Sequence, residues 1–318
     1  MSQAVKIIFM GSTPLALPCL QSLIDDKKFK ILAVATETDK QTGRKKILTP
    51  PQVKTLAIKN NINVLQPINI NKNTIFSDSI KKLQPDFIVT VSYGKILPAE
   101  ILKIAKYGAI NIHPSLLPKY RGASPIKSAI ANGDPITGIS FIRMNEKLDS
   151  GNILYVKKLP IELSDDAIIL RAKLGILGGK ELPKVLHGLI RGEIKETPQD
   201  NTLATYCHKL HGNDGFIDLN KLDATTILNR IRAFKPWPSC FLILEGKRLK
   251  IIEADINTED KIAPGTILQI AKNTISIGTK KGSIIPKTVQ LEGKRIMTIQ
   301  EFLSGNRDLF KALPASPK

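Results

Sequence analysis

Gly108-Ala-Ile-Asn-Ile-His113-Pro114 predicts an apolar strand that carries two polar side chains near its end. Side chains alternate between the two faces of a strand, so Asn111 and His113 point to the same side. A residue that precedes proline is disfavoured in the helical region, so Pro114 keeps His113 extended and ends the strand there. An amide and a titratable imidazole at the end of a strand are suited to stabilising a developing oxyanion.

A second polar segment, Leu148-Asp149-Ser150-Gly151, follows after a predicted helix and a further strand. Asp149 could return to the imidazole, orient it and favour its protonated form. The alternative is a plain turn, because Leu-Asp-Ser-Gly is good turn chemistry, and Asn111 and His113 could each be ordinary strand-end residues. The three residues together favour a catalytic cluster. The other histidines lack such neighbours and are expected to be structural or surface residues: His187, His208 and His211.

The sequence around this strand alternates apolar strands with helices, which is the pattern of a parallel α/β sheet. Ligands of such sheets bind beyond the carboxyl ends of the strands, where Asn111 and His113 fall. The predicted strands span residues 5–10, 31–36, 63–65, 86–91, 109–113 and 138–143. The predicted helices span residues 18–25, 51–60, 75–83, 99–105, 123–131 and about 164–187.

The pattern changes in the last third of the chain. Residues 191–206 begin with a polar stretch of balanced charge and predict a linker. One helix at residues 224–233 then precedes short strands with glycine-rich turns, at 241–244, 249–254, 274–278 and 283–286. Such strands favour a small β-barrel of the oligonucleotide-binding (OB) type. We therefore expect an N-terminal domain over residues 1–190, a linker over 191–206 and a C-terminal domain over 207–318.

The net charge indicates a class of partner. The 318 residues include 47 basic and 28 acidic side chains, a formal charge of +19, and the sequence pI is about 9.8. Residues 1–200 carry 29 basic and 17 acidic side chains and residues 201–318 carry 18 and 11, so both parts are basic. A polyanion that lies across both domains would account for this distribution. The alternative is a solvated surface that happens to be rich in lysine.

Several classes of protein are disfavoured. The sequence has no long uncharged apolar stretch, and the short apolar run at residues 5–10 contains Lys6, so it predicts a strand and not a signal peptide. The cysteines are three in number and widely spaced (Cys19, Cys207 and Cys240), which argues against disulfides and fits a reducing cytoplasm. Nothing has the Cys/His spacing of a zinc site, and we expect no metal.

The segments around Asn111 and Asp149 resemble the active-site signature of the folate-dependent formyltransferases: Asn-x-His, then Ser-Leu-Leu-Pro, then Leu-Asp-x-Gly. The resemblance covers nearly the whole chain and is closest to the branch of that family that acts on methionyl-tRNA. Other matching segments are residues 7–14 (first strand and turn), 43–46 (basic loop), 91–98 (wall of the folate pocket) and 231–238 (C-terminal domain). The shorter purine-pathway formyltransferases lack this C-terminal domain.

The resemblance implies a Rossmann-like catalytic domain with a mostly parallel sheet, plus an OB-like domain that binds tRNA. The implied reaction moves the formyl group of 10-formyltetrahydrofolate to the α-amino group of methionine on initiator tRNA, for translation initiation. The implied catalytic residues are Asn111, His113 and Asp149. The implied folate contacts are Ser115, Leu116, Leu117, Pro118, Tyr93 and Leu97, and the implied tRNA contacts are Arg44, Lys45, Lys46 and Lys209. We expect a monomer that needs neither a metal nor a membrane.

Some alternatives stay open at this point. The basic residues 44–46 lie in a loop predicted over residues 38–49, and a run of charges is often just a solvated surface. Other C-terminal candidates for phosphate contacts are individually weak: Arg232, Lys247, Arg248, Lys250, Lys294 and Arg295. Gly212-Asn213 stands where the resembling enzymes usually carry a charged pair.

Rival functions make different demands on the sequence. A formyltransferase for an amino sugar nucleotide or for glycinamide ribonucleotide would not account for the C-terminal motif. A nicotinamide-dependent oxidoreductase needs a glycine-rich phosphate turn, and Gly11-Ser-Thr-Pro is not one. A tRNA-binding protein without catalytic activity leaves Asn111, His113 and Asp149 unexplained.

Overall fold

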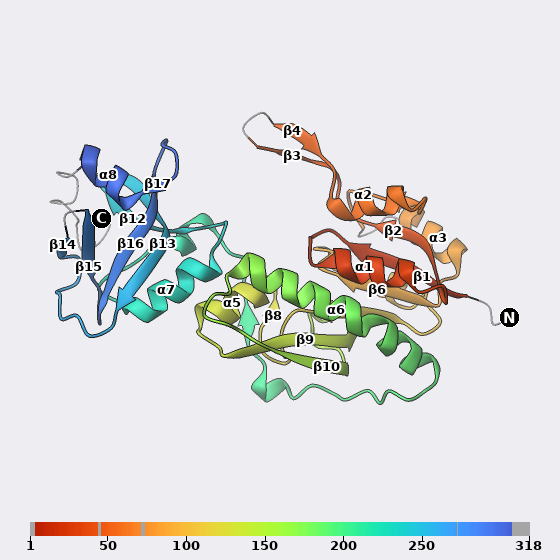
Figure 1. The fold of residues 1–318 in the computed structure, drawn as a ribbon. Helices are drawn as coiled ribbons and strands as arrows, with labels where there is room; N and C mark the ends of the chain where they lie inside the picture. Colours follow the sequence, from red (N-terminus) through yellow and green to blue (C-terminus); the bar gives the residue numbers. More distant parts are fainter. Residues whose placement is uncertain (1–3, 44–45, 71–73, 272, 307–318) are drawn as a thin grey trace. The chain divides into compact units, whose positions relative to one another are not determined.

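The computed structural model describes residues 4–43, 46–70, 74–271 and 273–306. Within them the chain forms two compact units (Figure 1). Unit 1 is built from Met1–Pro125, Ile136–Pro160 and Ile169–Cys207. Unit 2 is built from Ile126–Pro135, Ile161–Ile168 and His208–Lys318. Each unit is therefore assembled from segments that lie apart in the sequence.

Unit 1 contains a seven-stranded sheet with the order β10-β9-β7-β6-β1-β2-β5. The pairs β5–β2, β2–β1, β1–β6 and β6–β7 are parallel, whereas β9 and β10 are antiparallel to their neighbours. The predicted mostly parallel α/β sheet is thus confirmed. Its strands are β1 (Val5–Gly11), β2 (Phe29–Ala35), β5 (Val64–Leu65), β6 (Phe87–Val91), β7 (Ala109–His113), β9 (Ile136–Arg143) and β10 (Ile153–Pro160).

The centre of this sheet is covered on both faces. Ile7, Ile8, Phe9 and Met10 of β1 are all inaccessible to solvent, as expected for a parallel strand with layers on either side. One face packs against α3 (Thr74–Leu83) and α4 (Ala99–Leu102). The cluster on that face includes Ile8, Met10, Ile88, Phe76, Ile80 and Ile101.

The long helix α6 (Ala167–Ile190) packs closely against α1 (Ala16–Asp25). A Cβ atom on Gly179 would lie 2.6 Å from the carbonyl oxygen of Pro18, and one on Gly178 would lie 3.1 Å from Cys19 Sγ. Glycine at these positions lets the two helices approach. A shorter helix, α2 (Gln52–Lys59), also belongs to unit 1, whereas α5 (Pro125–Ala131) lies almost wholly in unit 2.

The prediction of a loop over residues 38–49 is wrong in part. Its ends form a short antiparallel hairpin, β3 (Lys40–Thr42) with β4 (Ile47–Thr49). All six residues of these strands are exposed, so no alternation of buried and exposed side chains marks the hairpin in the sequence. The strands β8 (Arg121–Gly122), β10 and β11 (Tyr206–Cys207) were also absent from the prediction.

Unit 2 is rich in antiparallel β-structure, as predicted for a separate C-terminal domain. Its six-stranded sheet has the path β12-β13-β16-β15-β14, and β17 pairs with β16. Three elements were not predicted: β14 (Ile267–Ala271), β17 (Met297–Thr298) and α8 (Ile299–Asn306). The others are α7 (Ala224–Ala233), β12 (Cys240–Leu244), β13 (Lys247–Asn257), β15 (Thr274–Gly278) and β16 (Ser283–Leu291).

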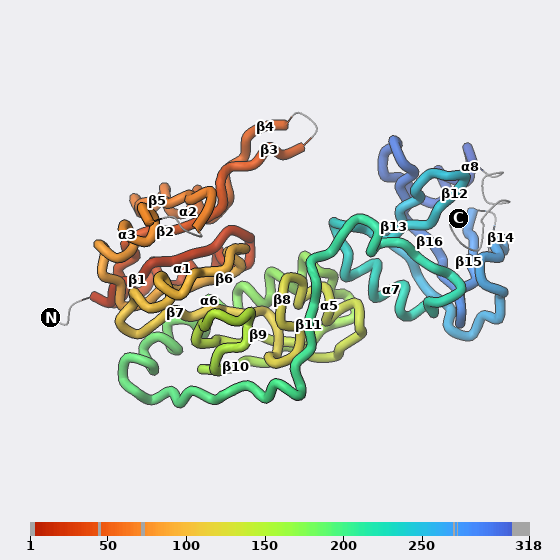
Figure 2. The backbone as a smooth tube through the Cα atoms, turned by 180° about the vertical axis from the view of Figure 1, so that it is seen from behind, coloured from red at the N-terminus to blue at the C-terminus, as the bar shows by residue number. Residues whose placement is uncertain are grey.

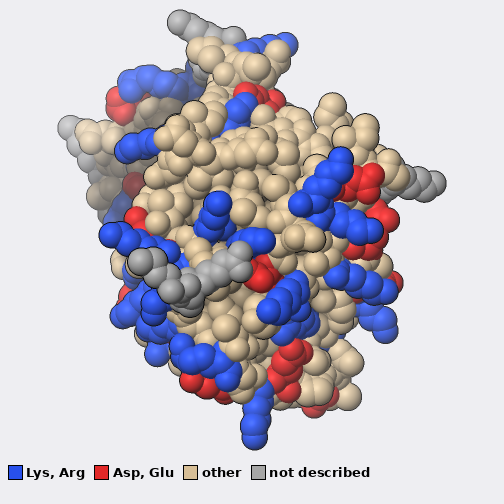
Figure 3. Space-filling view, turned by 90° about the vertical axis from the view of Figure 1, so that its right-hand side faces the viewer, with Lys and Arg blue, Asp and Glu red and all other residues tan. Residues whose placement is uncertain are grey.

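Two general features of the molecule are the hydropathy of its helices and the distribution of its charge. None of the described helices, α6 included, has the length and apolar character that crossing a membrane requires. On the face drawn in Figure 3, lysine and arginine side chains are spread widely, with acidic side chains between them. On this face the basic excess is distributed and does not form one compact patch.

A test of this architecture concerns the start of α7. Asp223 is its N-cap, and its carboxylate accepts a hydrogen bond of 2.7 Å from the backbone N–H of Thr226, which lowers the pKa of Asp223. We expect Asp223→Ala to destabilise the protein by about 1 kcal/mol at pH 7. A lowered pKa stabilises the fold above the ordinary aspartate value of about 3.9, and this contribution is lost as pH falls through the lowered pKa.

Urea unfolding of the wild type and Asp223→Ala at pH 7 and pH 3 measures this. The difference between the two proteins should shrink at pH 3. An equal difference at both pH values would contradict the assignment of the cap.

Candidate active site

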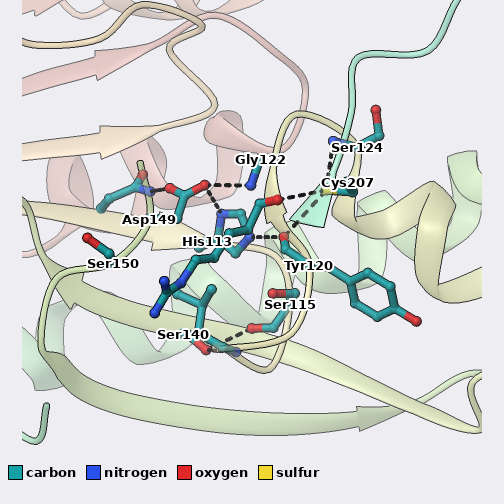
Figure 4. A network of polar contacts seen from close by, with 12 residues as sticks. His113, Ser115, Tyr120, Gly122, Ser124, Ser140, Asp149, Ser150 and Cys207 are labelled. Carbon is teal, nitrogen blue, oxygen red and sulfur yellow. Dashed lines mark hydrogen bonds and ion pairs between the residues drawn. The ribbon is translucent and has the colours of Figure 1, made fainter. Parts of the chain in front are cut away.

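The predicted strand at residues 109–113 is β7, with the bounds that the sequence indicated. It lies between β6 and β9, and both Asn111 and His113 pair with β9. Asn111 donates a hydrogen bond to Asp149 in a later loop. Figure 4 shows the ring of His113 directed at the same carboxylate. The structure therefore brings together the three residues that the sequence proposed as catalytic.

Asp149 connects the other residues of this cluster. Its Oδ1 accepts a hydrogen bond from Asn111 Nδ2 at 3.4 Å, and its Oδ2 accepts one from the backbone N–H of Gly122 at 2.8 Å. The same Oδ2 lies 3.6 Å from Nδ1 of His113. Only 11% of the Asp149 side chain is exposed and only 5% of His113, so little water competes with these contacts.

Both ring nitrogens of His113 face oxygen atoms that accept hydrogen bonds. Nε2 lies 2.9 Å from the backbone oxygen of Tyr120, and Nδ1 faces the carboxylate of Asp149. A carbonyl oxygen can only accept, so Nε2 carries a proton. A second proton on Nδ1 would satisfy the other contact, and this arrangement suits an imidazolium ion paired with a carboxylate.

Thr90 orients the amide of Asn111, and no sequence motif marks this threonine. The Thr90 hydroxyl lies 2.9 Å from Asn111 Oδ1 and is buried at the end of β6. Because Oδ1 accepts from Thr90, Nδ2 is turned toward Asp149. An amide nitrogen carries two hydrogens, so Nδ2 can donate to Asp149 and to one further acceptor.

The loop after β7 is held by its own polar groups. Ser115 is buried; its hydroxyl donates to a backbone carbonyl four residues later at 2.6 Å, and its carbonyl accepts from the Ser140 hydroxyl at 2.7 Å. The backbone N–H of Leu117 donates to the same Ser140 hydroxyl at 3.0 Å. Leu117 is buried, whereas Leu116 and Pro118 are partly exposed. These contacts agree with a packing role, and the folate role of the four residues stays a prediction.

Tyr93 and Leu97 lie in the core cluster on the α3–α4 side of the sheet, 3% and 2% exposed. Burial raises the pKa of Tyr93 to about 12. Its hydroxyl has no hydrogen-bond partner among the described residues. An unpaired buried hydroxyl costs free energy, so Tyr93 is a position at which a polar ligand group would be stabilised.

Two of the four predicted tRNA contacts lie within the described residues. Arg44 and Lys45 are outside the described residues, whereas Lys46 and Lys209 are described and exposed. In unit 2, Arg232 donates to the backbone oxygens of residues 162, 163 and 165. Arg248 donates to Asn213 Oδ1 at 2.9 Å, so the unusual Gly212-Asn213 pair has a partner within this unit. These two arginines are used in part for internal contacts.

One further group near the cluster had no signal in the sequence. Gln199, in the segment predicted as a linker, is 9% exposed and contacts the loop that carries Asp149.

Among the residues that the structure describes, no group of three histidine, cysteine, aspartate or glutamate side chains could hold a metal ion.

The turn after Asp149 accepts only glycine. A Cβ atom on Gly151 would lie 1.6 Å from the backbone oxygen of Arg143 and 2.8 Å from its carbonyl carbon, so a side chain there would clash with backbone atoms. We expect Gly151→Ala to cost about 1–3 kcal/mol, as overpacking does. Gly305→Ala is the control, because nothing lies within 4 Å of a Cβ atom there. Thermal unfolding should separate the two variants, and equal melting temperatures would contradict the packing at Gly151.

Comparisons with known proteins cover almost the whole chain. The family model described as formyl transferase matches residues 5–186, and the model described as formyl transferase, C-terminal domain, matches residues 209–307. A methionyl-tRNA formyltransferase of Caldicellulosiruptor saccharolyticus is 45% identical over 95% of this chain and 97% of its own length. Another, of Thermodesulfovibrio yellowstonii, is 41% identical over 95% of this chain and 96% of its own length.

Solved structures share the fold at lower identity. An N-formyltransferase of Helicobacter canadensis, in complex with folinic acid and dTDP-3-aminofucose, has a TM-score of 0.67 at 20% identity, over 89% of this chain and 98% of that one. HypX of Aquifex aeolicus, in complex with tetrahydrofolic acid, has a TM-score of 0.64 at 18% identity, over 95% of this chain and 47% of that one. The family resemblance seen in the sequence is thus confirmed: the chain belongs to the formyl transferase family, among the methionyl-tRNA formyltransferases.

Proposed function

We propose that this chain transfers the formyl group of 10-formyltetrahydrofolate to the α-amino group of methionine esterified to initiator tRNA, and that Asn111, His113 and Asp149 carry out the chemistry. The family membership and the curated relatives support the reaction. The observation that supports the residues is the contact of one carboxylate with both other side chains, through Asn111 Nδ2 at 3.4 Å and His113 Nδ1 at 3.6 Å.

The reaction exchanges one C–N bond for another. The lone pair of the methionine amine attacks the formyl carbon, and the carbonyl oxygen becomes the oxyanion of a tetrahedral intermediate. The bond from that carbon to N10 of the folate then breaks. The attacking nitrogen loses one proton and N10 gains one, so the reaction neither takes up nor releases a proton overall.

Each side chain has a role in this sequence. The second N–H of Asn111 donates to the oxyanion, and the charge of the His113 imidazolium stabilises it. Both His113 nitrogens already have partners, so direct donation from the ring requires it to leave Tyr120 or Asp149. Asp149 holds the imidazolium and accepts the amine proton on its way to N10.

The remaining assignments follow the division of the chain. We propose that residues 1–190 form the catalytic domain, with Ser115–Pro118, Tyr93 and Leu97 near the folate. We propose that residues 191–206 connect it to a tRNA-binding domain over residues 207–318, which includes Lys209. The protein acts as a monomer in the cytoplasm, an environment that suits its three cysteines, which are buried and form no disulfide.

Loss of the catalytic groups should lower kcat. We expect Asn111→Ala to reduce kcat for formylation of methionyl-tRNA on the order of 10²–10³-fold, because it removes an oxyanion donor. His113→Ala and Asp149→Asn should lose at least as much. Steady-state rates with charged initiator tRNA and 10-formyltetrahydrofolate measure this.

His187→Gln serves as the control, because His187 contacts Asp26 and Phe29 and neither of these residues belongs to the cluster. Its kcat should stay close to that of the wild type. Full activity in all three cluster variants would reject the assigned chemistry. Efficient formylation of a nucleotide-linked amino sugar in place of methionyl-tRNA would reject the proposed acceptor.

The basic residues between β3 and β4 provide a separate test. We propose that Arg44, Lys45 and Lys46 contact the acceptor end of the tRNA through its phosphates. Arg44→Ala should raise KM for methionyl-tRNA about tenfold and leave KM for 10-formyltetrahydrofolate unchanged. Lys30→Ala, a change at another exposed basic residue of unit 1, is the control. Equal increases in both KM values for Arg44→Ala would refute the separate roles.

A further inference from the structure

Residues 196–207, which we call the strap, cross the site on their way out of unit 1. At one end, Thr197 and Ile153 exchange backbone hydrogen bonds of 2.8 and 2.9 Å at the start of β10. At the other end, β11 pairs in parallel with β8, which contains Arg121 and Gly122. Figure 2 shows the tube passing β10 before it reaches β11. The strap is thus fixed on both sides of the cluster.

Gln199 lies between these two anchors, and both atoms of its amide group make hydrogen bonds. Its Nε2 donates to the backbone oxygens of Asp149 at 2.8 Å and Gly151 at 2.7 Å. Its Oε1 accepts from Arg121 Nε at 3.1 Å and Nη2 at 2.7 Å. One side chain therefore uses two donors and two acceptor sites, all that an amide has.

Both contacts of Gln199 affect the catalytic carboxylate. Asp149 has φ of +48°, a left-handed conformation that is unfavourable for a residue with a side chain, and it must be held there by its surroundings. The bond to its carbonyl oxygen fixes this conformation. The second contact is the one between Gln199 and Arg121. Arg121 precedes Gly122, whose N–H donates to the Asp149 carboxylate, so this contact holds in place the donor that orients the carboxylate.

The burial of Arg121 indicates that this side chain holds the strap. Its side chain is 2% exposed, and its hydrogen bonds go to neutral oxygens of Gln199, Asn201 and Tyr206, all in the strap. A buried guanidinium needs such partners to offset its lost hydration. Arg121 consequently holds the strap in place, and the strap in turn holds Gln199.

We propose that Gln199, buttressed by Arg121, is a positioning residue that sets the geometry between Asp149 and His113. The proposal rests on the function proposed above, since that function assigns Asp149 to the reaction. Gln199 touches neither substrate nor the reacting atoms; it acts through Asp149.

Gln199→Glu is the informative variant. It keeps the size of the side chain and gives Arg121 a carboxylate partner, but it turns an oxygen in place of two N–H donors toward the carbonyls of Asp149 and Gly151. We expect kcat to fall about 10²-fold, as for a misplacement of about 1 Å. KM for each substrate should stay within about threefold of the wild type, whereas the melting temperature should fall, because two buried carbonyl oxygens lose their donors.

Two further variants distinguish an effect on Asp149 from a general disturbance of the strap. Glu196→Gln is the matched control in the strap, because Glu196 bonds Arg143 and Asn152 and not Asp149, and its kcat should stay within about twofold of the wild type. The double variant Gln199→Glu/Asp149→Asn should lose no more activity than Asp149→Asn alone, since both changes act on one group. Additive losses would overturn the proposal.

A readout independent of activity separates this proposal from the proposed function. In protein labelled with ¹³C-histidine, the His113 resonance is identified among four by its loss in His113→Ala. It should shift in Gln199→Glu and not in Glu196→Gln. An unchanged His113 resonance overturns the positioning role whatever the activity. A wild-type protein that formylates no methionyl-tRNA refutes the proposed function, and the resonance still tests Gln199.

If Gln199→Glu does not fold, Gln199→Met/Arg121→Met replaces it, because apolar residues of similar size often substitute for a buried charge without loss of stability. This variant also lacks both donors to the Asp149 loop. It should shift the same resonance and lower kcat, and wild-type values of both would overturn the proposal.

Discussion

The contacts of the Asp149 carboxylate determine the structure of the site. One oxygen accepts from the backbone of Gly122 and faces the ring of His113, and the other accepts from Asn111. These contacts join the end of a strand, the loop after it and a turn almost forty residues later. Because the carboxylate and the ring are nearly buried, the loss of any one of these contacts would be costly.

This arrangement requires an unfavourable backbone at Asp149, and the surrounding chain supplies the compensation. Gly151 lets the turn pack against Arg143, and Gln199 bonds the carbonyl groups on both sides of Ser150. The strap that carries Gln199 continues directly into unit 2. The chain therefore leads to its second unit through the same residues that hold the Asp149 turn, so a change in the strap acts directly on this turn.

Particular elements explain which parts of the fold were predictable. The strand at residues 109–113 was predicted with its correct bounds, because its apolar pattern and Pro114 act locally. The β3–β4 hairpin was missed because all its side chains are exposed, and β10 because lysines interrupt its apolar residues. The pairing of β8 with β11 joins residues more than eighty positions apart, and no local pattern encodes it.

The sequence by itself determined the α/β class, the β-rich C-terminal unit, the polar strand end and the family, because these depend on short-range periodicity and on motifs that stand together. Only the tertiary structure decided that Thr90 turns the amide of Asn111, that both His113 nitrogens face acceptors, and that Gln199 and a buried Arg121 hold the Asp149 turn. A lone threonine or glutamine carries no periodic signal. Its role arises from hydrogen bonds between distant segments, whose partners are defined once the chain has folded.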